Sequence, residues 1–415
     1  MSGIKLSFCI PTYNRAPFLE NALSYFETRY RFDFPYEIVI SDNASTDNTA
    51  EVVEAFRARG LPIRYYRRSS NGGSLANAAS AFHHAIGTYA FYHADDDALV
   101  PEGIVDAVRF LDANPDVVAC HAPWTLYNEV AGKDVSQFYS VDADRKFERG
   151  SFADVFQFMY ERHIFPEIGI YRASVLKSAW VPREFCFWAF SYLAHFLEEG
   201  AVAFLKRPFY RSVTVSKVGA ARQQAGNDQV MTDWDKYRGG LEYFLYLGLK
   251  RGRIPNTREA RADYEQKCRA FTLNRMAVAV RFWVARKDYI KAYELYTRLA
   301  IGGLGDHPEV AELKKSLPLM AGIQTLVWHA ASPAGIKRLI LSGVADRQAL
   351  ADMLRQLGLP SEIEIVEEPS VHNPEDAEST AVFVPNASSY DRFVSLGYKP
   401  NLIFTDRDLV GNVMI

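Results

Sequence analysis

KLSFCIPTYNRAPFLENALSYFETRY, residues 5–30, joins a β-rich run, a short polar loop and an amphipathic helical pattern. This succession repeats along the chain as far as about residue 124. Strands are predicted at residues 5–10, 36–41, 63–68, 89–94 and 117–122. Helices are predicted at residues 17–30, 49–60, 75–87 and 102–115, the last ending at an Asn-Pro stop signal. Such alternation is typical of an α/β doubly wound domain with a mostly parallel sheet.

A polar loop follows each of the first four predicted strands. The loops are PTYNR (11–15), SDNASTDNT (41–49), SSNGGSLAN (69–77) and ADDD (94–97). The carboxyl ends of parallel strands meet at one edge of a sheet, and doubly wound sheets bind their ligands there. The sequence therefore predicts a binding site built from these four loops.

The rest of the chain changes character twice. Residues 125–150 show little periodicity and are predicted to be a loop or lid, and residues 226–325 are predicted to be almost purely helical. A plain helix-packing subdomain is favoured there over helical repeats, a dimer face or a membrane-surface face. The last part returns to α/β alternation and resembles a small Rossmann-like half domain without a GxGxxG fingerprint. We expect three domains, at residues 1–225, 226–325 and 326–415.

The C-terminal part contains an acidic stretch, residues 362–378, with seven carboxylates and no Lys or Arg. Charge runs of this kind are usually solvated. We expect a solvated edge and loop here, and the sequence assigns no chemistry to this domain.

Composition limits the partners and the compartment. The formal net charge of −3 gives no support for nucleic acid as the main partner. The four cysteines are scattered and lack metal-ligand spacing, which favours a reducing, cytoplasmic setting. The N-terminal run is too short for a secretory signal, and no apolar stretch approaches the length of a membrane span. We expect a soluble chain with at most peripheral membrane contact.

The ADDD loop places three adjacent aspartates, Asp95, Asp96 and Asp97, at a strand end. An isolated triplet of this kind is more often a solvated surface loop. A hard divalent cation, Mg²⁺ or Mn²⁺, prefers carboxylate oxygens and completes its shell with water and substrate phosphates. Beside the other three loops, the triplet therefore indicates a metal and diphosphate site.

Two other loops allow both a ligand and a structural interpretation. Asp42 ends the second predicted strand, where its carboxylate can accept a hydrogen bond from a base N–H. The next residues, Ser45 to Asp47, are predicted instead to cap the following helix. Gly72 and Gly73 precede a helix, a geometry that lets backbone N–H groups approach a phosphate or sugar, although Asn-Gly is also a common turn.

In order and spacing, the segments SFCIPTYNRAPFLENAL, EIVISDNASTDNTAEVV and NGGSLANAASAFHHAIGTYAFYHADDDALVPEGI resemble the family 2 glycosyltransferases of the GT-A fold, which use nucleotide sugars. The resemblance covers roughly residues 4–215 and is strongest in the first 120. It implies a Rossmann-like, mostly parallel sheet, a nucleotide diphosphate sugar donor and a Mg²⁺ or Mn²⁺ cofactor.

The resemblance also implies roles for individual residues. Those implied to bind nucleotide and donor sugar are Pro11, Thr12, Tyr13, Asn14, Arg15, Asp42, Asn71, Gly72, Gly73, Asn77, Asp95 and Asp96. Asp42 would contact the base, which is uracil in the commonest members. Asp95 and Asp97 would hold the cation and the diphosphate.

This chain departs from the family pattern at two places. Family members carry an acidic general base near the start of the helix that ends here in EEG (198–200), and by spacing this position falls at Ala189. Glu184 is the nearest substitute, so the implied catalytic residues are Glu184 and Asp97. Many members also carry a histidine after the last strand of the domain, where RSVTVSKVG (211–219) has none.

The leading interpretation is an inverting transfer of sugar, from a donor that is most often UDP-linked, to a glycan, lipid-linked or protein acceptor in bacterial surface glycan synthesis. A sugar-phosphate nucleotidyltransferase is disfavoured, because PTYNR is not the glycine-rich, basic loop of such enzymes. The alternative is a catalytically degenerate nucleotide-sugar-binding or scaffold module of a polysaccharide assembly complex, which the missing acid at Ala189 would explain.

We expect a cytoplasmic protein, at most peripheral at the inner membrane face. The oligomeric state is not specified by the sequence.

Overall fold

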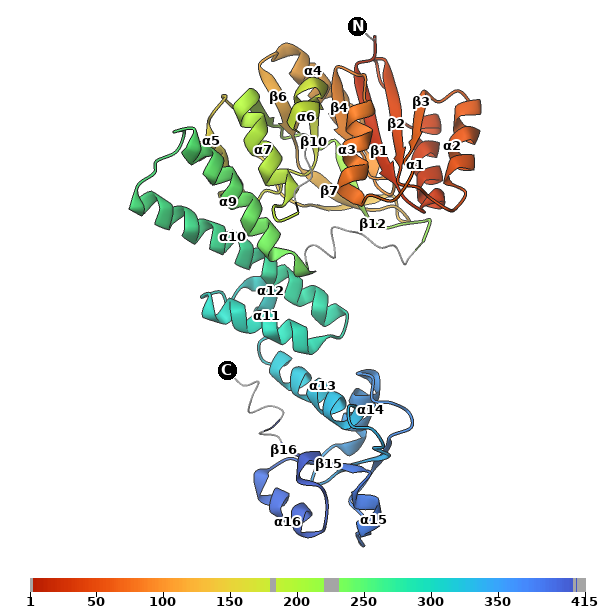
Figure 1. Ribbon diagram of the computed structural model, residues 1–415, viewed down its shortest axis with the longest axis vertical. Coiled ribbons are helices and arrows are strands. Elements are labelled where there is room, and N and C mark those ends of the chain that lie inside the picture. The colour runs from red at the N-terminus through yellow and green to blue at the C-terminus, as the bar shows by residue number, and fades with distance from the viewer. Residues whose placement is uncertain (1–2, 180–183, 220–230, 406–407, 409–415) are drawn as a thin grey trace. The chain divides into compact units, whose positions relative to one another are not determined.

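The computed structural model describes residues 3–179, 184–219, 231–405 and 408 (Figure 1). The chain divides into two compact units. The first holds the described residues of 1–224 together with 235–272, and the second those of 225–234 together with 273–415. The division into three domains stays a prediction.

The first unit is built on an eight-stranded sheet with the order β3-β2-β1-β4-β10-β6-β11-β9. Strands β1 to β4 are parallel neighbours, whereas β10 and β9 run antiparallel to their partners. The strands are β1 Leu6–Thr12, β2 Tyr36–Asp42, β3 Ile63–Arg67, β4 Tyr89–Tyr92, β6 Val117–His121, β9 Arg145–Phe147, β10 Gly169–Arg172 and β11 Ala201–Phe204. The five strands predicted from the alternation are thus confirmed, and so is the mixed, mostly parallel α/β sheet.

The central strands form because their side chains are apolar on both faces. Phe8 and Ile10 of β1 and Val39 of β2 are fully buried, as expected for a parallel sheet covered on both sides. The helices are α1 Ala16–Thr28, α2 Thr49–Ala58, α3 Ser74–His84, α4 Pro101–Ala113, α5 Phe152–Arg162, α6 Ala173–Ala179 and α7 Trp188–Glu199. Of these, α3, α6 and α7 lie side by side over one face of the sheet (Figure 1).

A second sheet in the same unit has the order β5-β12-β7-β8. Its strands are β5 Ala98–Leu99, β7 Trp124–Asn128, β8 Lys133–Gln137 and β12 Tyr210–Val215. The predicted loop or lid at residues 125–150 is wrong, because this range contains β8, β9 and most of β7. Strand β8 is exposed at every position, so no alternation of buried and exposed residues marks it in the sequence.

Helices continue through the middle of the chain as predicted. They are α9 Trp234–Lys250, α10 Arg258–Ala285, α11 Tyr289–Ile301, α12 Pro308–Ala311 and α13 Leu317–Ala331. None of the helices in the described ranges combines the length and apolar character needed to cross a membrane. In the second unit, Val280, Leu299 and Ala321 belong to one buried cluster that joins α10, α11 and α13.

The C-terminal part of the second unit is a four-stranded parallel sheet with the order β14-β13-β15-β16. Its elements are β13 Arg338–Leu341, α14 Arg347–Gln356, β14 Glu364–Val366, α15 Pro374–Ala377, β15 Thr380–Val384, α16 Tyr390–Ser395 and β16 Ile403–Thr405, with 3₁₀ turns at Ala387–Ser389 and Pro400–Leu402. This confirms the predicted small α/β domain. Leu326 of α13 and Leu339 of β13 lie in its core.

Candidate functional site

Four loops meet at one edge of the large sheet. Strands β3, β2, β1 and β4 are adjacent and parallel, so their carboxyl ends point the same way. We call the residues that follow them, 11–15, 42–49, 68–77 and 94–97, the rim. The prediction that these polar clusters share one edge is confirmed, and hydrogen bonds between them define the site.

The first and fourth rim loops are joined through Asp95. The hydroxyl of Thr12 donates to Oδ2 of Asp95 at 2.7 Å, and Nε of Arg15 lies 3.3 Å from Oδ1 of the same carboxylate. The Arg15 guanidinium also pairs with Asp96. The side chains of Asp95 and Asp96 are only 5% and 7% exposed, so the triplet is not a solvated surface loop. Arg15 therefore places a positive charge beside two carboxylates, Asp95 and Asp96, that are shielded from water.

Asp97 points away from its two neighbours, toward β12. Its Oδ2 accepts a hydrogen bond of 2.8 Å from the Tyr210 hydroxyl, and its Oδ1 accepts one of 2.8 Å from the backbone N–H of Val213. Burial and the charge of Asp97 raise the pKa of Tyr210 well above its usual range, which keeps this hydroxyl a donor. Sequence reasoning missed Tyr210 and Val213. Their contact depends on the pairing of β12 with β5, which no local pattern reveals.

Asp42 lies at the end of β2 and is 1% exposed. Its Oδ1 accepts from the Ser45 N–H at 2.8 Å, and its Oδ2 accepts from the Tyr65 hydroxyl at 2.6 Å. Arg67 lies 3.7 Å from the same Oδ2. Tyr65 and Arg67 are two further residues that sequence reasoning missed, although their spacing by two along β3 places them on one face of the sheet. The structure thus shows a charged acceptor held in place at the rim, and its role in base binding stays a prediction.

The third rim loop is fixed by amide side chains. Asn71 accepts at Oδ1 from Asn43, at 2.7 Å, and from the Gly73 N–H, at 2.9 Å. Gly73 has a φ of 85° and directly precedes α3, as predicted. A Cβ at Gly72 would lie 2.4 Å from the Arg68 guanidinium, so a larger residue there would require the Arg68 side chain to shift.

Asn77 has a structural role that the sequence did not indicate. It is 3% exposed, donates to the carbonyls of Thr12 and Ser41, and accepts from the Ser41 hydroxyl. The amide therefore ties the ends of β1 and β2 together below the rim. A contact from Asn77 to a donor sugar stays a prediction.

The loop after β1 presents its side chains at the surface. Pro11 is half-buried in β1, Tyr13 is 41% exposed and Asn14 is exposed with a φ of 51°. Asn14 donates its N–H to Ser45 at 2.9 Å and accepts from the Thr46 N–H at 2.7 Å, which locks the first two loops together. An accessible aromatic ring on a fixed loop is suited to stacking against a flat ligand.

The capping prediction for Ser45 to Asp47 is wrong in its details. Helix α2 begins at Thr49, and neither Ser45 nor Thr46 caps it, because both are used in contacts to the first loop. Asp47 accepts from the Thr49 N–H at 3.2 Å and from the Ala16 N–H at 3.0 Å, so one carboxylate serves the starts of both α2 and α1.

Glu184 lies outside the hydrogen-bonded rim network. It is exposed in a bend before α7, and Ala189 is a buried residue in the first turn of that helix. The adjoining segment is held by α9, where Gly239 and Gly240 approach the carbonyls of Phe185 and Phe187. Because a Cβ at residue 239 would lie 2.4 Å from the Phe185 carbonyl, this contact requires glycine.

The donor set of the rim suits a cation that is shared with a ligand. In the ranges that the structure describes, no three or more His, Cys, Asp or Glu side chains gather into a cage for a metal. Mg²⁺ is usually held by one or two carboxylates together with substrate phosphates and water. Asp95 and Asp97 carry hard carboxylate oxygens of this kind, but Asp95 faces Thr12 and Arg15 whereas Asp97 faces Tyr210 and Val213, so a Mg²⁺ or Mn²⁺ ion shared between them stays a prediction.

Comparison with known proteins relates part of this chain to a protein family. Residues 7–176 match the family described as Glycosyl transferase family 2. Abequosyltransferase RfbV of Salmonella typhimurium is 39% identical over 116 residues, which are 28% of this chain and 35% of that protein. The curated relatives are thus matched over about a third of their length, 35% and 36% for the first two.

Two solved structures show a more distant likeness. TarS of S. aureus, residues 1–349 in complex with UDP-GlcNAc, is 17% identical, covers 79% of this chain and 87% of its own, and has a TM-score of 0.46. Mannosyltransferase PcManGT from Pyrobaculum calidifontis, in complex with GDP-Man and Mn²⁺, is 16% identical, covers 76% of this chain and 80% of its own, and has a TM-score of 0.43.

Proposed function

Since residues 7–176 match Glycosyl transferase family 2, we propose that this chain moves a sugar from a nucleotide diphosphate sugar to an acceptor hydroxyl with inversion at the sugar. The donor is most simply UDP-linked. The observation that carries the proposal is the convergence of Thr12, Arg15 and Asp95 from two loops that lie far apart in the sequence. Fold alone does not determine function, but this family and this rim together support a sugar donor site.

Different rim residues bind different parts of the donor. Asp42 accepts a hydrogen bond from the base, and Tyr13 and Asn14 line the nucleoside pocket on the exposed first loop. Asn71, Gly72 and Gly73 flank the nucleotide and the sugar from the loop that precedes α3. Asp42 is prearranged for this by Tyr65 and Ser45, which fix its carboxylate.

The diphosphate is handled by the acidic loop. Asp95 and Asp97 would hold Mg²⁺ or Mn²⁺, and the bound cation would neutralise charge that develops on the departing nucleotide diphosphate. Arg15 pairs with Asp95 and Asp96 and so holds both carboxylates in place. Tyr210 and the Val213 N–H fix Asp97, so that its carboxylate does not have to be ordered when the donor binds.

The acceptor side requires a base. We assign this role to Glu184, which is exposed and so accessible to an acceptor hydroxyl. The base would take the proton of that hydroxyl as the oxygen attacks the sugar from the face opposite the nucleotide. The name of RfbV, an abequosyltransferase, supports the transfer of a sugar. The acceptor we propose is a glycan, lipid-linked or protein hydroxyl of a bacterial surface glycan. Such acceptors are assembled on the cytoplasmic side, where we place this chain.

One observation favours a second function. The position where family members carry the acidic base is Ala189, which is 2% exposed and cannot transfer a proton. A chain that lacks a base could still bind a nucleotide sugar as a module of a polysaccharide assembly complex.

A turnover assay separates the two functions. The protein is incubated with each of several nucleotide sugars, Mn²⁺ and a bacterial lysate that supplies acceptors, and the release of nucleotide diphosphate is measured, with Asp95→Asn as the inactive control. Release above that control supports the transferase. Donor binding without release supports the binding module.

A further inference from the structure

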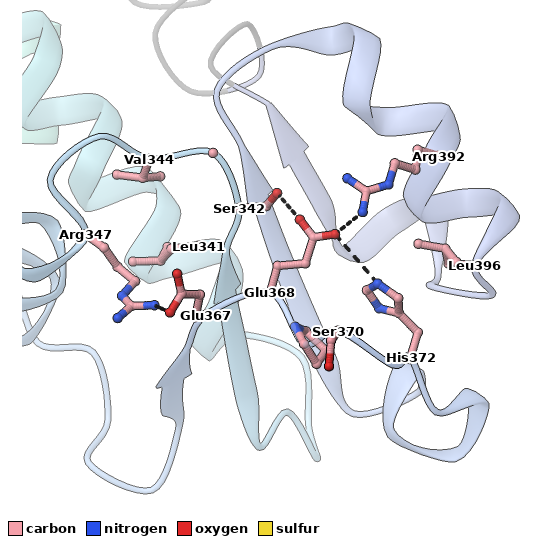
Figure 2. Close-up of a pocket in the computed structure, with 12 residues that line it drawn as sticks. Leu341, Ser342, Val344, Arg347, Glu367, Glu368, Ser370, His372, Arg392 and Leu396 are labelled. Atoms are coloured by element: carbon pink, nitrogen blue, oxygen red, sulfur yellow. Dashed lines mark hydrogen bonds and ion pairs between the residues drawn. The ribbon is translucent and has the colours of Figure 1, made fainter.

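A cavity of about 620 Å³ lies in the second unit, which the family match does not reach (Figure 2). It is formed by the loop after β13, the loop after β14 and helix α16. The acidic stretch at 362–378 was predicted to be a solvated edge without chemistry. Glu368 is not solvated as predicted, because its side chain faces this cavity and is only 19% exposed.

The topology places the cavity where parallel sheets bind ligands. The chain runs from β13 to β14 on one side and then crosses to β15 on the other side of β13. The connections therefore diverge at the carboxyl end of β13, and ligands of open α/β sheets bind at such switch points. Ser342 and Gly343, which follow β13, lie in the wall of the cavity, and Gly343 has a φ of 66° at this turn.

Glu368 is the most firmly held carboxylate of the cavity. Its Oε2 accepts from the Ser342 hydroxyl at 2.6 Å, and its Oε1 pairs with the Arg392 guanidinium and lies 3.6 Å from Nε2 of His372 (Figure 2). An ionised carboxylate has about four acceptor positions, so these contacts leave it able to accept further hydrogen bonds. It is thus an oriented acceptor at the end of the second strand of its sheet.

The cavity does not favour a phosphate group. Helix α14, the helix nearest the turn, already has a carboxylate at its start, because Asp346 accepts from the Ala349 N–H at 3.0 Å. The two arginines of the cavity are paired with glutamates, Arg347 with Glu367 and Arg392 with Glu368. An uncharged ligand that donates hydrogen bonds matches these groups better than an anion does.

We propose that this cavity binds the ribose of a nucleoside, with Glu368 accepting hydrogen bonds from the 2′ and 3′ hydroxyls. In dinucleotide-binding sheets of the order 3-2-1-4, a carboxylate after the glycine-rich turn accepts the ribose 2′ hydroxyl; this sheet has the order 2-1-3-4, and Glu368 offers a carboxylate beyond β14, the strand next to β13. Val344 and Leu396 supply apolar surface for the base. The cavity volume lies in the range of small-molecule sites.

Calorimetric titration of the full chain tests the proposal. The ligands are the four common ribonucleosides, their 2′-deoxy counterparts and methyl α-glucopyranoside. Each titration is repeated on Asp42→Ala, which should weaken nucleoside binding at the rim and leave this cavity unchanged. We expect at least one ribonucleoside to bind about tenfold or more tightly than its deoxy counterpart, because a hydrogen bond to a charged group is lost.

Variants locate the binding. Glu368→Gln should weaken the ribonucleoside about tenfold or more, and Leu396→Trp, which keeps the carboxylate but fills the cavity, should weaken it as well. Glu362→Gln, an exposed residue of the same acidic stretch, should bind as the unmodified chain does. Circular dichroism confirms that each variant is folded.

Three results would overturn the proposal. They are equal affinity for ribose and deoxyribose forms, unchanged binding by the two cavity variants, and no binding of any ribonucleoside. Binding of the methyl glucoside alone would also contradict it, because the cavity would then be a saccharide site.

Discussion

The hydroxyl of Thr12 donates a 2.7 Å hydrogen bond to Oδ2 of Asp95, a residue that follows it by 83 positions in the chain. Thr12 ends β1 and is 3% exposed, and Asp95 lies just beyond β4 and is 4% exposed. This contact fixes the acidic loop to the centre of the sheet. The rim is therefore organised before any ligand arrives, which is the condition for strong electrostatic stabilisation of a leaving group.

Replacing Thr12 by valine should loosen this arrangement. Valine keeps the shape of threonine but removes the donor, so Asp95 loses a partner worth about 1 to 3 kcal/mol at a buried site. We expect UDP affinity in the presence of Mn²⁺ to fall by about five- to a hundredfold, measured by calorimetry. Thr28→Val, at the exposed end of α1, is the control. Equal affinity in both variants would show that the Thr12 contact does not organise the site.

Replacing Asp42 by alanine should weaken nucleotide binding while the fold is kept. Loss of the hydrogen bond to the base should cost about 1 to 3 kcal/mol of binding free energy. Tyr65→Phe is the matched variant, because it removes only the hydroxyl that holds Asp42, and it should have a smaller effect. If Asp42→Ala binds UDP, GDP and dTDP as tightly as the unmodified chain, Asp42 is not in the site.

The sequence predicted the strands and loops of the rim well because local patterns are sufficient there. Apolar runs mark β1 to β4, and parallel order brings their ends together. The partners of Asp97 could not be predicted, since Tyr210 reaches it only through the pairing of β12 with β5. Strand β8 was missed because both of its faces are exposed. The acidic run predicts a solvated Glu368, because a charge run does not show which of its members a neighbouring helix covers.

Replacing Glu184 by glutamine tests the proposed base. We expect the turnover rate to fall by about 10²- to 10⁴-fold, the usual contribution of general base catalysis. UDP affinity should not change, because Glu184 lies outside the rim network. The control is Glu161→Gln, another exposed glutamate of the same unit. Unchanged turnover of Glu184→Gln would assign the proton transfer to another group.

Stability of the first unit should fall as the pH is lowered from neutrality. Burial lowers the pKa of His121 to about 4, against 6.5 for an exposed histidine. The unfolded chain therefore binds more protons between these two values, so stability is present above pH 6.5 and is lost as the pH falls toward 4. His93 acts in the same direction, since burial also lowers its pKa to about 4.

Urea denaturation between pH 5 and pH 7 measures this effect. His121→Phe keeps the ring contact with Phe204 and should reduce the slope of unfolding free energy against pH by at most about one proton, roughly 1.4 kcal/mol per pH unit near pH 5 and less near pH 7. The same slope in His121→Phe as in the unmodified chain would contradict the assignment. His83→Gln, at an exposed position of α3, should leave the slope unchanged.

The most direct test of the account is calorimetric titration of UDP with and without Mn²⁺, on the unmodified chain and on Asp95→Asn and Asp97→Asn. If the acidic loop holds a cation against a diphosphate, Mn²⁺ should raise UDP affinity about tenfold or more, equal to 1.4 kcal/mol, and both variants should lose this gain. Asp33→Asn, an exposed aspartate before β2, should keep it. UDP binding that is tight, independent of Mn²⁺ and indifferent to both substitutions would contradict the proposed cation site.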